Sequence, residues 1–131
     1  MTKTVVFVTN QFSSDRLIHA AEIVAKKLRT QLNIVEIMDS EYDLDPEAVD
    51  YLFMLAQKTG ATMRLMSAED KFGTMCGIIE EPDVRCVVTG MPQSHQSILY
   101  DIWKKFPRKA FHVLDSSGEI VEVAHNKFAT A

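Results

Sequence analysis

Apolar residues are arranged along this chain in short continuous runs separated by longer segments of helical spacing. The runs at residues 4–9, 32–38, 62–66, 84–89 and 110–114 predict five strands, and such near-continuous runs are typical of strands covered on both faces. In the intervals between them, apolar residues recur every three or four positions, which predicts four amphipathic helices. Strands and helices therefore alternate, a pattern that indicates a parallel sheet with right-handed crossovers and helices on both faces.

The predicted helix ends carry residues suited to capping. One of residues 13–15 can cap the first helix, and Ser94 or His95 is expected to open the fourth. The segment 45–47 predicts the start of the second helix, because it places a proline in the first turn and acidic groups beside it. Gly60 is the expected C-cap of that helix.

After the fifth strand the pattern changes from a crossover to a hairpin. Residues 115–118 predict a turn, and an apolar segment at about 119–124 predicts a strand that pairs back in antiparallel fashion. The predicted fold is thus α/β, an open doubly wound parallel five-stranded sheet with helices on both faces plus a C-terminal antiparallel strand. We expect one domain over residues 1–131, with a core at about 3–115 and a tail at 125–131.

Composition narrows the class of protein. The chain has 131 residues, of which 47% are hydrophobic and 24% charged, and its net charge of −4 argues against a nucleic-acid partner or an anionic membrane surface. Apolar runs fall well short of the ~20 residues of a membrane span. The two cysteines, Cys76 and Cys86, have no metal-ligand spacing and predict buried free thiols, so we expect a cytoplasmic protein.

Polar residues gather where predicted strands end, and the carboxyl ends of parallel strands meet at one edge of the sheet, where open α/β sheets bind ligands. We therefore take these positions as candidate ligand-binding residues. They are Thr9, Asn10, Gln11, Ser13 and Ser14 after the first strand, Met38 and Asp39 at the end of the second, and Gly90, Gln93, Ser94, His95 and Ser97 after the fourth.

These residues do not assemble into a recognisable catalytic or metal-binding motif. His95 could act as a general base, but no nucleophile is tied to it. Asp39 and Asp43 could form a carboxylate pair, although an acidic loop explains them as well. A phosphoacceptor receiver domain needs paired acids after the first strand, where this chain has Thr9 and Asn10. We assign no catalytic residue and no metal site.

An apolar strand at residues 5–9 is followed by a polar loop with serines and a helix, and the fourth strand ends in the sequence Val87-Val88-Thr89-Gly90. These two segments resemble the universal stress protein family. The likeness covers about residues 3–115, and residues 13–18 look most like the stress-protein-type domain of osmosensing potassium-responsive histidine kinases. The resemblance implies an adenine nucleotide alpha hydrolase-like fold, a stress-response or signalling role and dimerisation through the last strands.

Members of the family that bind ATP carry Gly-x2-Gly-x9-Gly-Ser/Thr from the fourth strand. Here Gly90 is the first glycine, but the following positions hold Gln93, Trp103 and Lys104, and the family's acidic residue after the first strand is Thr9. The glycines let backbone N–H groups approach phosphates, so the motif is degenerate. The site is expected to bind a nucleotide or small anion weakly through neutral side chains and one helix dipole, or else to be a solvated loop cluster.

Three functions remain open. The first is a regulatory or ligand-sensing domain without turnover, forming a homodimer through residues 110–123. The second is a stress protein that binds ATP or another adenine nucleotide as cofactor and hydrolyses it slowly. The third is a protein-interaction domain comparable to those fused to kinases or transporters. The first two predict a ligand at the strand-end loops, whereas the third predicts none.

Overall fold

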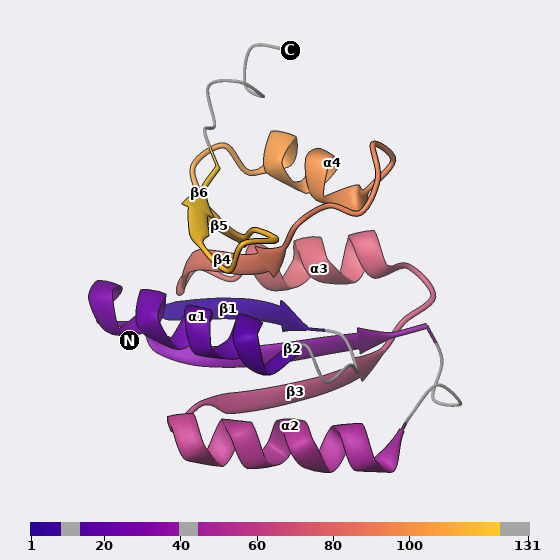
Figure 1. Cartoon of the computed structure of the whole chain (residues 1–131). Coiled ribbons are helices and arrows are strands. Elements are labelled where there is room, and N and C mark those ends of the chain that lie inside the picture. Colours follow the sequence, from indigo (N-terminus) through magenta and orange to yellow (C-terminus); the bar gives the residue numbers. More distant parts are fainter. Residues whose placement is uncertain (9–13, 40–44, 124–131) are drawn as a thin grey trace.

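The computed structural model describes residues 1–8, 14–39 and 45–123, and Figure 1 shows them as a single sheet between two layers of helix. Strands and helices alternate as expected. The elements are β1 (Lys3–Val8), α1 (Ser14–Leu28), β2 (Gln31–Met38), α2 (Pro46–Thr59), β3 (Thr62–Ser67), α3 (Lys71–Ile79), β4 (Val84–Gly90), α4 (Ile98–Lys105), β5 (Ala110–Leu114) and β6 (Ile120–Glu122).

The sheet has the strand order β3-β2-β1-β4-β5-β6. The first five strands are parallel to their neighbours, and β6 pairs antiparallel with β5. This confirms the predicted doubly wound fold with its C-terminal antiparallel strand. The chain order reverses between β1 and β4, so the carboxyl ends of these two strands form the topological switch point where such sheets bind ligands.

Each face of the sheet carries its own hydrophobic core. Side chains of α1 and α2, such as Ile18 and Leu52, pack with Val6 and Val88 on one face. Ile79 of α3 and the α4 side chains pack with alternate residues of the same strands on the other face. Trp103 belongs to this second core and is buried, which explains why the third glycine of a phosphate loop has no equivalent there.

Capping residues set the ends of α2 as the sequence predicts. The carboxylate of Asp45 accepts a hydrogen bond from the Glu47 amide at 3.1 Å. At the other end Gly60 adopts the left-handed conformation, with φ of 71°, and its N–H donates to the carbonyls of the last turn. A side chain at residue 60 would be strained in this conformation, which accounts for the glycine.

The fourth helix begins later than predicted. The predicted start at Ser94 or His95 is wrong, because Ser97 is the N-cap and accepts a hydrogen bond from the Leu99 amide at 3.2 Å. The preceding residues are held by turns of their own. The Ser97 amide donates to the carbonyl of Ser94 at 3.2 Å, and the Gln96 amide donates to the Ser94 hydroxyl at 3.2 Å. The loop after β4 is therefore longer than expected.

Two further observations bear on the sequence analysis. Cys76 and Cys86 are both free and both buried, as expected. Among the described residues, no helix has the length and apolar character needed to cross a membrane.

Candidate functional site

A cavity of about 830 Å³ lies at the carboxyl edge of the sheet, at the switch point. Its walls come from the ends of β1, β2, β4 and β5, the first turns of α1 and α3, and the loop between β4 and α4. The described lining residues are Phe7, Val8, Ser14, Arg16, Leu17, Ile37, Lys71, Met75, Thr89, Gly90, Met91, Pro92, Gln93, Ser94, Ser97, Leu99, Leu114, Asp115 and Ser116. We call this space the carboxyl-edge cavity. Its size is in the range of small-molecule sites.

Five of the candidate residues named from the sequence line this cavity. They are Ser14, Gly90, Gln93, Ser94 and Ser97.

Three other candidates are described but are not among the lining residues. Met38 is buried, Asp39 is exposed, and His95 is exposed in the loop before α4. Thr9, Asn10, Gln11 and Ser13 lie outside the described residues, as does Asp43 of the carboxylate pair considered from the sequence.

The charged groups of the cavity are Arg16, Lys71 and Asp115. Arg16 forms no ion pair shorter than 4 Å with another described residue, whereas the Lys71 ammonium lies 3.3 Å from the carboxylate of exposed Asp39. Hydrogen bonds from Ser117 and the Glu119 amide lower the pKa of Asp115, so this carboxyl is ionised at neutral pH. The lining thus has two cations and one anion, which favours an anionic ligand.

Gly90 contributes open space to the cavity. A Cβ built at this position meets no heavy atom within 4 Å. The Thr89 hydroxyl donates to the Gly90 carbonyl at 2.9 Å, and this hydrogen bond stabilises the end of β4. A methyl group at residue 90 would therefore meet no neighbouring atom, and Gly90 is one of the residues that line the cavity.

The sequence analysis missed the charged lining groups. Arg16 and Lys71 stand in the first turns of α1 and α3, and helix first turns at this edge follow directly from the strand–helix alternation. Asp115 follows the fifth strand, so the strand-end rule applied to the first and fourth strands would have found it. The position of Asp115 at a strand end could therefore have identified it, but the sequence analysis interpreted residues 115–118 only as a turn.

The described residues of the site have the chemistry of a binding site. Among them, no group of three or more His, Cys, Asp or Glu side chains is arranged to hold a metal ion. The buried Cys76 of α3 is not among the residues that line the cavity, and burial raises the pKa of its thiol above the ordinary value. Cations, hydroxyls and amides around an open hollow are groups that can hold an anion.

Comparison with solved structures identifies the fold, whereas the sequence comparisons find no match. No protein-family model matches the sequence, and a search of curated proteins finds no similar sequence. Among solved structures, the chain is similar to a universal stress protein from Archaeoglobus fulgidus, with a TM-score of 0.63 and 16% identity over 88% of this chain and 93% of that one.

The same similarity extends to two further structures. One is the universal stress protein from Archaeoglobus fulgidus in complex with dAMP, with a TM-score of 0.60 and 16% identity over 88% of this chain and 97% of that one. The other is a protein from the universal stress protein family from Burkholderia pseudomallei, with a TM-score of 0.55 and 14% identity over 87% and 94%. The chain therefore has the universal stress protein fold.

Proposed function

We propose that this chain is a universal-stress-protein-like domain, extending over residues 1–131, that senses a nucleotide or small anion without turning it over. The observation that carries the proposal is the carboxyl-edge cavity at the switch point, with Arg16 and Lys71 in its walls. A ligand bound there would contact the ends of β1 and β4 and the loop before α4.

Adenine nucleotides are the ligand class that we favour. A protein of the same fold has a structure in complex with dAMP, a ligand with a planar base and one phosphate. The cavity here combines apolar lining, such as Phe7 and Leu99, with cations and hydroxyl groups. The degenerate glycine motif argues that a phosphate is held by side chains, with Arg16 and Ser97 in place of a glycine cradle.

Thermal denaturation with dAMP, AMP, ATP and inorganic phosphate tests this proposal. A ligand at a hundred times its dissociation constant stabilises the folded state by about 2.7 kcal/mol, which is a measurable rise in melting temperature. We expect dAMP or AMP to produce this rise. The proposal is wrong if none of the four compounds shifts the melting temperature at millimolar concentration.

The variant Gly90→Leu should remove the ligand-dependent shift, because its side chain would occupy open space beside a residue that lines the cavity. Gly77→Leu is the matched control. Gly77 is an exposed glycine of α3, outside the cavity lining, and a Cβ there also meets nothing within 4 Å. If Gly90→Leu keeps the full shift while folding normally, the ligand binds elsewhere.

A homodimer through residues 110–123 is part of the proposed function. The exposed edge of the sheet on this side is β6, and Val121 in it is 49% exposed. An unpaired strand edge with an apolar residue is suited to pairing with a second copy. Light scattering at micromolar concentration should give twice the mass of the 14.8 kDa chain, and a monomeric mass would contradict the dimer.

The cytoplasmic location of the protein also stays a prediction.

A further inference from the structure

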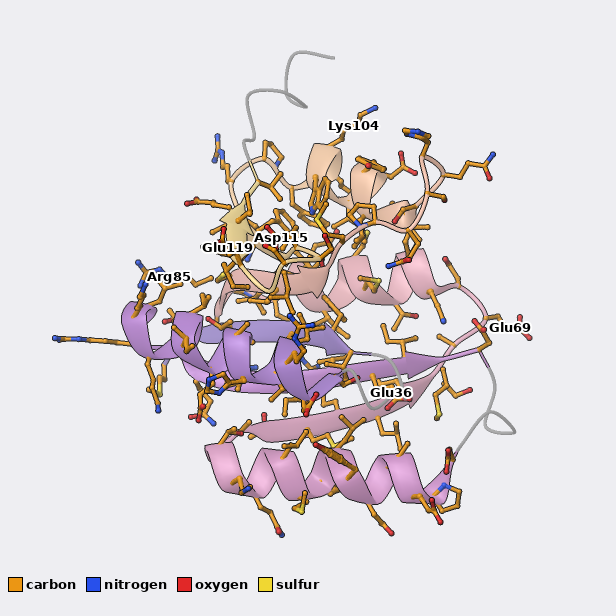
Figure 2. The ribbon with its side chains drawn as sticks, in the orientation of Figure 1. Glu36, Glu69, Arg85, Lys104, Asp115 and Glu119 are labelled. Atoms are coloured by element: carbon orange, nitrogen blue, oxygen red, sulfur yellow. The ribbon has the colours of Figure 1, made fainter. Side chains whose placement is uncertain are left out.

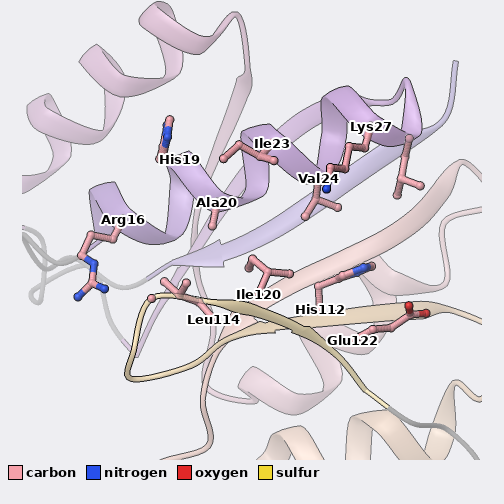
Figure 3. Close-up of a pocket in the computed structure, with 12 residues that line it drawn as sticks. Arg16, His19, Ala20, Ile23, Val24, Lys27, His112, Leu114, Ile120 and Glu122 are labelled. Carbon is pink, nitrogen blue, oxygen red and sulfur yellow. The ribbon is translucent and has the colours of Figure 1, made fainter.

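A second hollow, of about 630 Å³, lies between α1 and the β5–β6 hairpin (Figure 3). We call it the α1–hairpin groove. Figure 3 shows α1 along one side and the two strands of the hairpin along the other. Among the described residues the groove shares Arg16 and Leu114 with the carboxyl-edge cavity, and its volume is again that of a small-molecule site.

The body of the groove is apolar. Its walls are formed by one side of α1 and by the residues of β5 and β6 that face the same side of the sheet. These apolar lining residues are Ala20, Ile23, Val24, Leu28, Leu114 and Ile120. Leu114 and Ile120 are directly opposite each other in the antiparallel ladder, and Ile23 is 46% exposed. A large apolar group placed here would remove this surface from water.

One end of the groove carries three polar side chains. His112 and Glu122 are opposite each other in the β5–β6 ladder, and Lys27 comes from α1 on the other wall (Figure 3). Neither Lys27 nor Glu122 forms an ion pair shorter than 4 Å with another described residue. This end therefore offers one cation and one carboxylate on opposite walls.

His112 at this end is fixed and uncharged. Its Nδ1 lies 3.0 Å from the Sγ of buried Cys86, which orients the ring. Burial lowers the pKa of His112, so the imidazole is neutral at pH 7 and adds a hydrogen-bonding group without a charge. Burial also raises the pKa of Cys86 to about 12, so its thiol stays protonated beside the ring.

Arg16 lies at the other end of the groove. A Cβ built at Gly118, in the turn between β5 and β6, would lie 2.5 Å from Nη2 of Arg16. The guanidinium therefore lies against the hairpin turn, and the glycine makes room for it. The groove is consequently polar at the end with Lys27 and Glu122 and apolar along its length, and the Arg16 guanidinium lies at the other end.

We propose that the α1–hairpin groove binds a free amino acid with a large apolar side chain. Lys27 would take its carboxylate, Glu122 its ammonium group, and the side chain would lie between Ile23 and Ile120. Charge complementarity supports this class of ligand, because a zwitterion matches both Lys27 and Glu122, whereas a molecule with only a carboxylate or only an amine matches one of them.

Calorimetric titration with L-phenylalanine, N-acetyl-L-phenylalanine and L-phenylalaninamide tests the charge requirement. The three probes share the apolar side chain and differ in which charged groups they carry. L-Phenylalanine should bind most tightly, and each blocked analogue should bind about tenfold more weakly, as expected for the loss of one charge-assisted hydrogen bond. Equal affinity for all three probes would overturn the proposal.

Two pairs of variants locate the binding site. Lys27→Gln should weaken L-phenylalanine binding about tenfold and leave L-phenylalaninamide binding unchanged. Glu122→Gln should also weaken L-phenylalanine binding about tenfold, and it should leave N-acetyl-L-phenylalanine binding unchanged. Ile23→Ser should weaken all three probes. Phe53→Ser is its matched control, because Phe53 is 49% exposed on α2 and lies outside the groove lining.

The outcomes separate this proposal from its rivals. Absence of L-phenylalanine binding at millimolar concentration, or an equal loss in Phe53→Ser, would overturn it. Light scattering on Ile23→Ser tests whether the groove is instead an interface between two copies of the chain. If this variant halves the mass of the protein and the wild type binds no probe, the groove is an interface between two copies and the amino-acid site is wrong.

Discussion

The two ends of the parallel strands differ in how their charges are used. At the amino edge the Lys3 ammonium lies 3.0 Å from Asp83 and 3.7 Å from Glu81. Both nitrogens at the tip of Arg64 donate to the Glu81 carboxylate, at 3.1 and 3.2 Å. The Lys109 ammonium donates to the Glu81 carbonyl at 3.3 Å, so five charged side chains hold this edge together.

The carboxyl edge has charges without such partners. Arg16 forms no ion pair shorter than 4 Å with another described residue, and Lys71 is paired only with exposed Asp39. Glu36, near the end of β2, is 2% exposed, and its Oε2 has no hydrogen-bond partner among the described residues (Figure 2). The difference teaches that charges at the amino edge are used in ion pairs, whereas the carboxyl edge combines cations with open space, as the proposed ligand would need.

The largest expected effect comes from removing the positive charge of Arg16 at the carboxyl edge. Arg16→Gln should weaken dAMP binding about tenfold to a hundredfold, since a charge-assisted hydrogen bond contributes ~1.5–3 kcal/mol. Calorimetric titration measures this loss. The melting temperature without ligand should change little, because the guanidinium has no ion pair to lose among the described residues.

Arg108→Gln is the control for this prediction, because Arg108 is an exposed arginine outside the cavity lining. It should leave dAMP affinity as in the wild type. An equal loss in both variants would mean that the overall charge, rather than the position of Arg16, governs binding.

The second effect concerns Glu36. Burial raises the pKa of this carboxyl, and the positive charge of Lys71 only partly offsets the effect. The pKa of Glu36 is higher in the folded state than in the unfolded state, so folding favours the protonated carboxyl. The free energy of unfolding therefore falls as the pH rises above about 4.5, because the buried carboxyl must then ionise. Glu36→Met should therefore stabilise the protein at pH 7 by ~1–2 kcal/mol.

Urea denaturation at pH 7 and at pH 4 checks this prediction. The stabilisation by Glu36→Met should shrink at the lower pH, where the wild-type carboxyl is already protonated in both states. A gain that is equal at the two pH values would show that ionisation of Glu36 carries no cost, and a loss at pH 7 would show that the carboxylate has a favourable role.

The smallest effect belongs to the amino edge. Hydrogen bonds from Arg64 lower the pKa of Glu81, so the contribution of this pair to stability is present above pH 4.5 and is lost as pH falls through the lowered value. Both side chains are about one-third exposed, and Arg64→Gln should cost ~0.5–1 kcal/mol at neutral pH.

Denaturation at pH 7 and at pH 2.5 measures the Arg64→Gln effect, which should be smaller at the acidic pH because protonation of Glu81 weakens the pair. Titration with dAMP should give the wild-type affinity. A change in affinity as large as that of Arg16→Gln would remove the distinction between the two edges.

The fold could be read from the sequence because burial of both faces imposes a strong pattern. The apolar runs gave every strand, and local chemistry at Asp45 and Gly60 gave both ends of α2. The start of α4 was missed because Ser94 and Ser97 are equally good caps in sequence, and the turn hydrogen bonds that decide between them depend on the loop geometry.

The candidate site could be predicted only in part. The strand-end rule located Ser14, Gly90 and the loop before α4, because topology alone brings them to one edge. The α1–hairpin groove has no comparable signal. Its lining comes from one side of a helix and from alternate positions of two strands, so its existence depends on how far α1 extends over the sheet, which no local pattern encodes.

Arg16 has a consequence for how the two hollows relate, because it lines both. An anion in the carboxyl-edge cavity and a ligand at that end of the groove would therefore both lie beside the same guanidinium. Ligands in the two hollows would then be linked through one side chain. Thermodynamic linkage requires that each ligand alter the affinity of the other by the same factor, so a measurement in either direction determines the coupling.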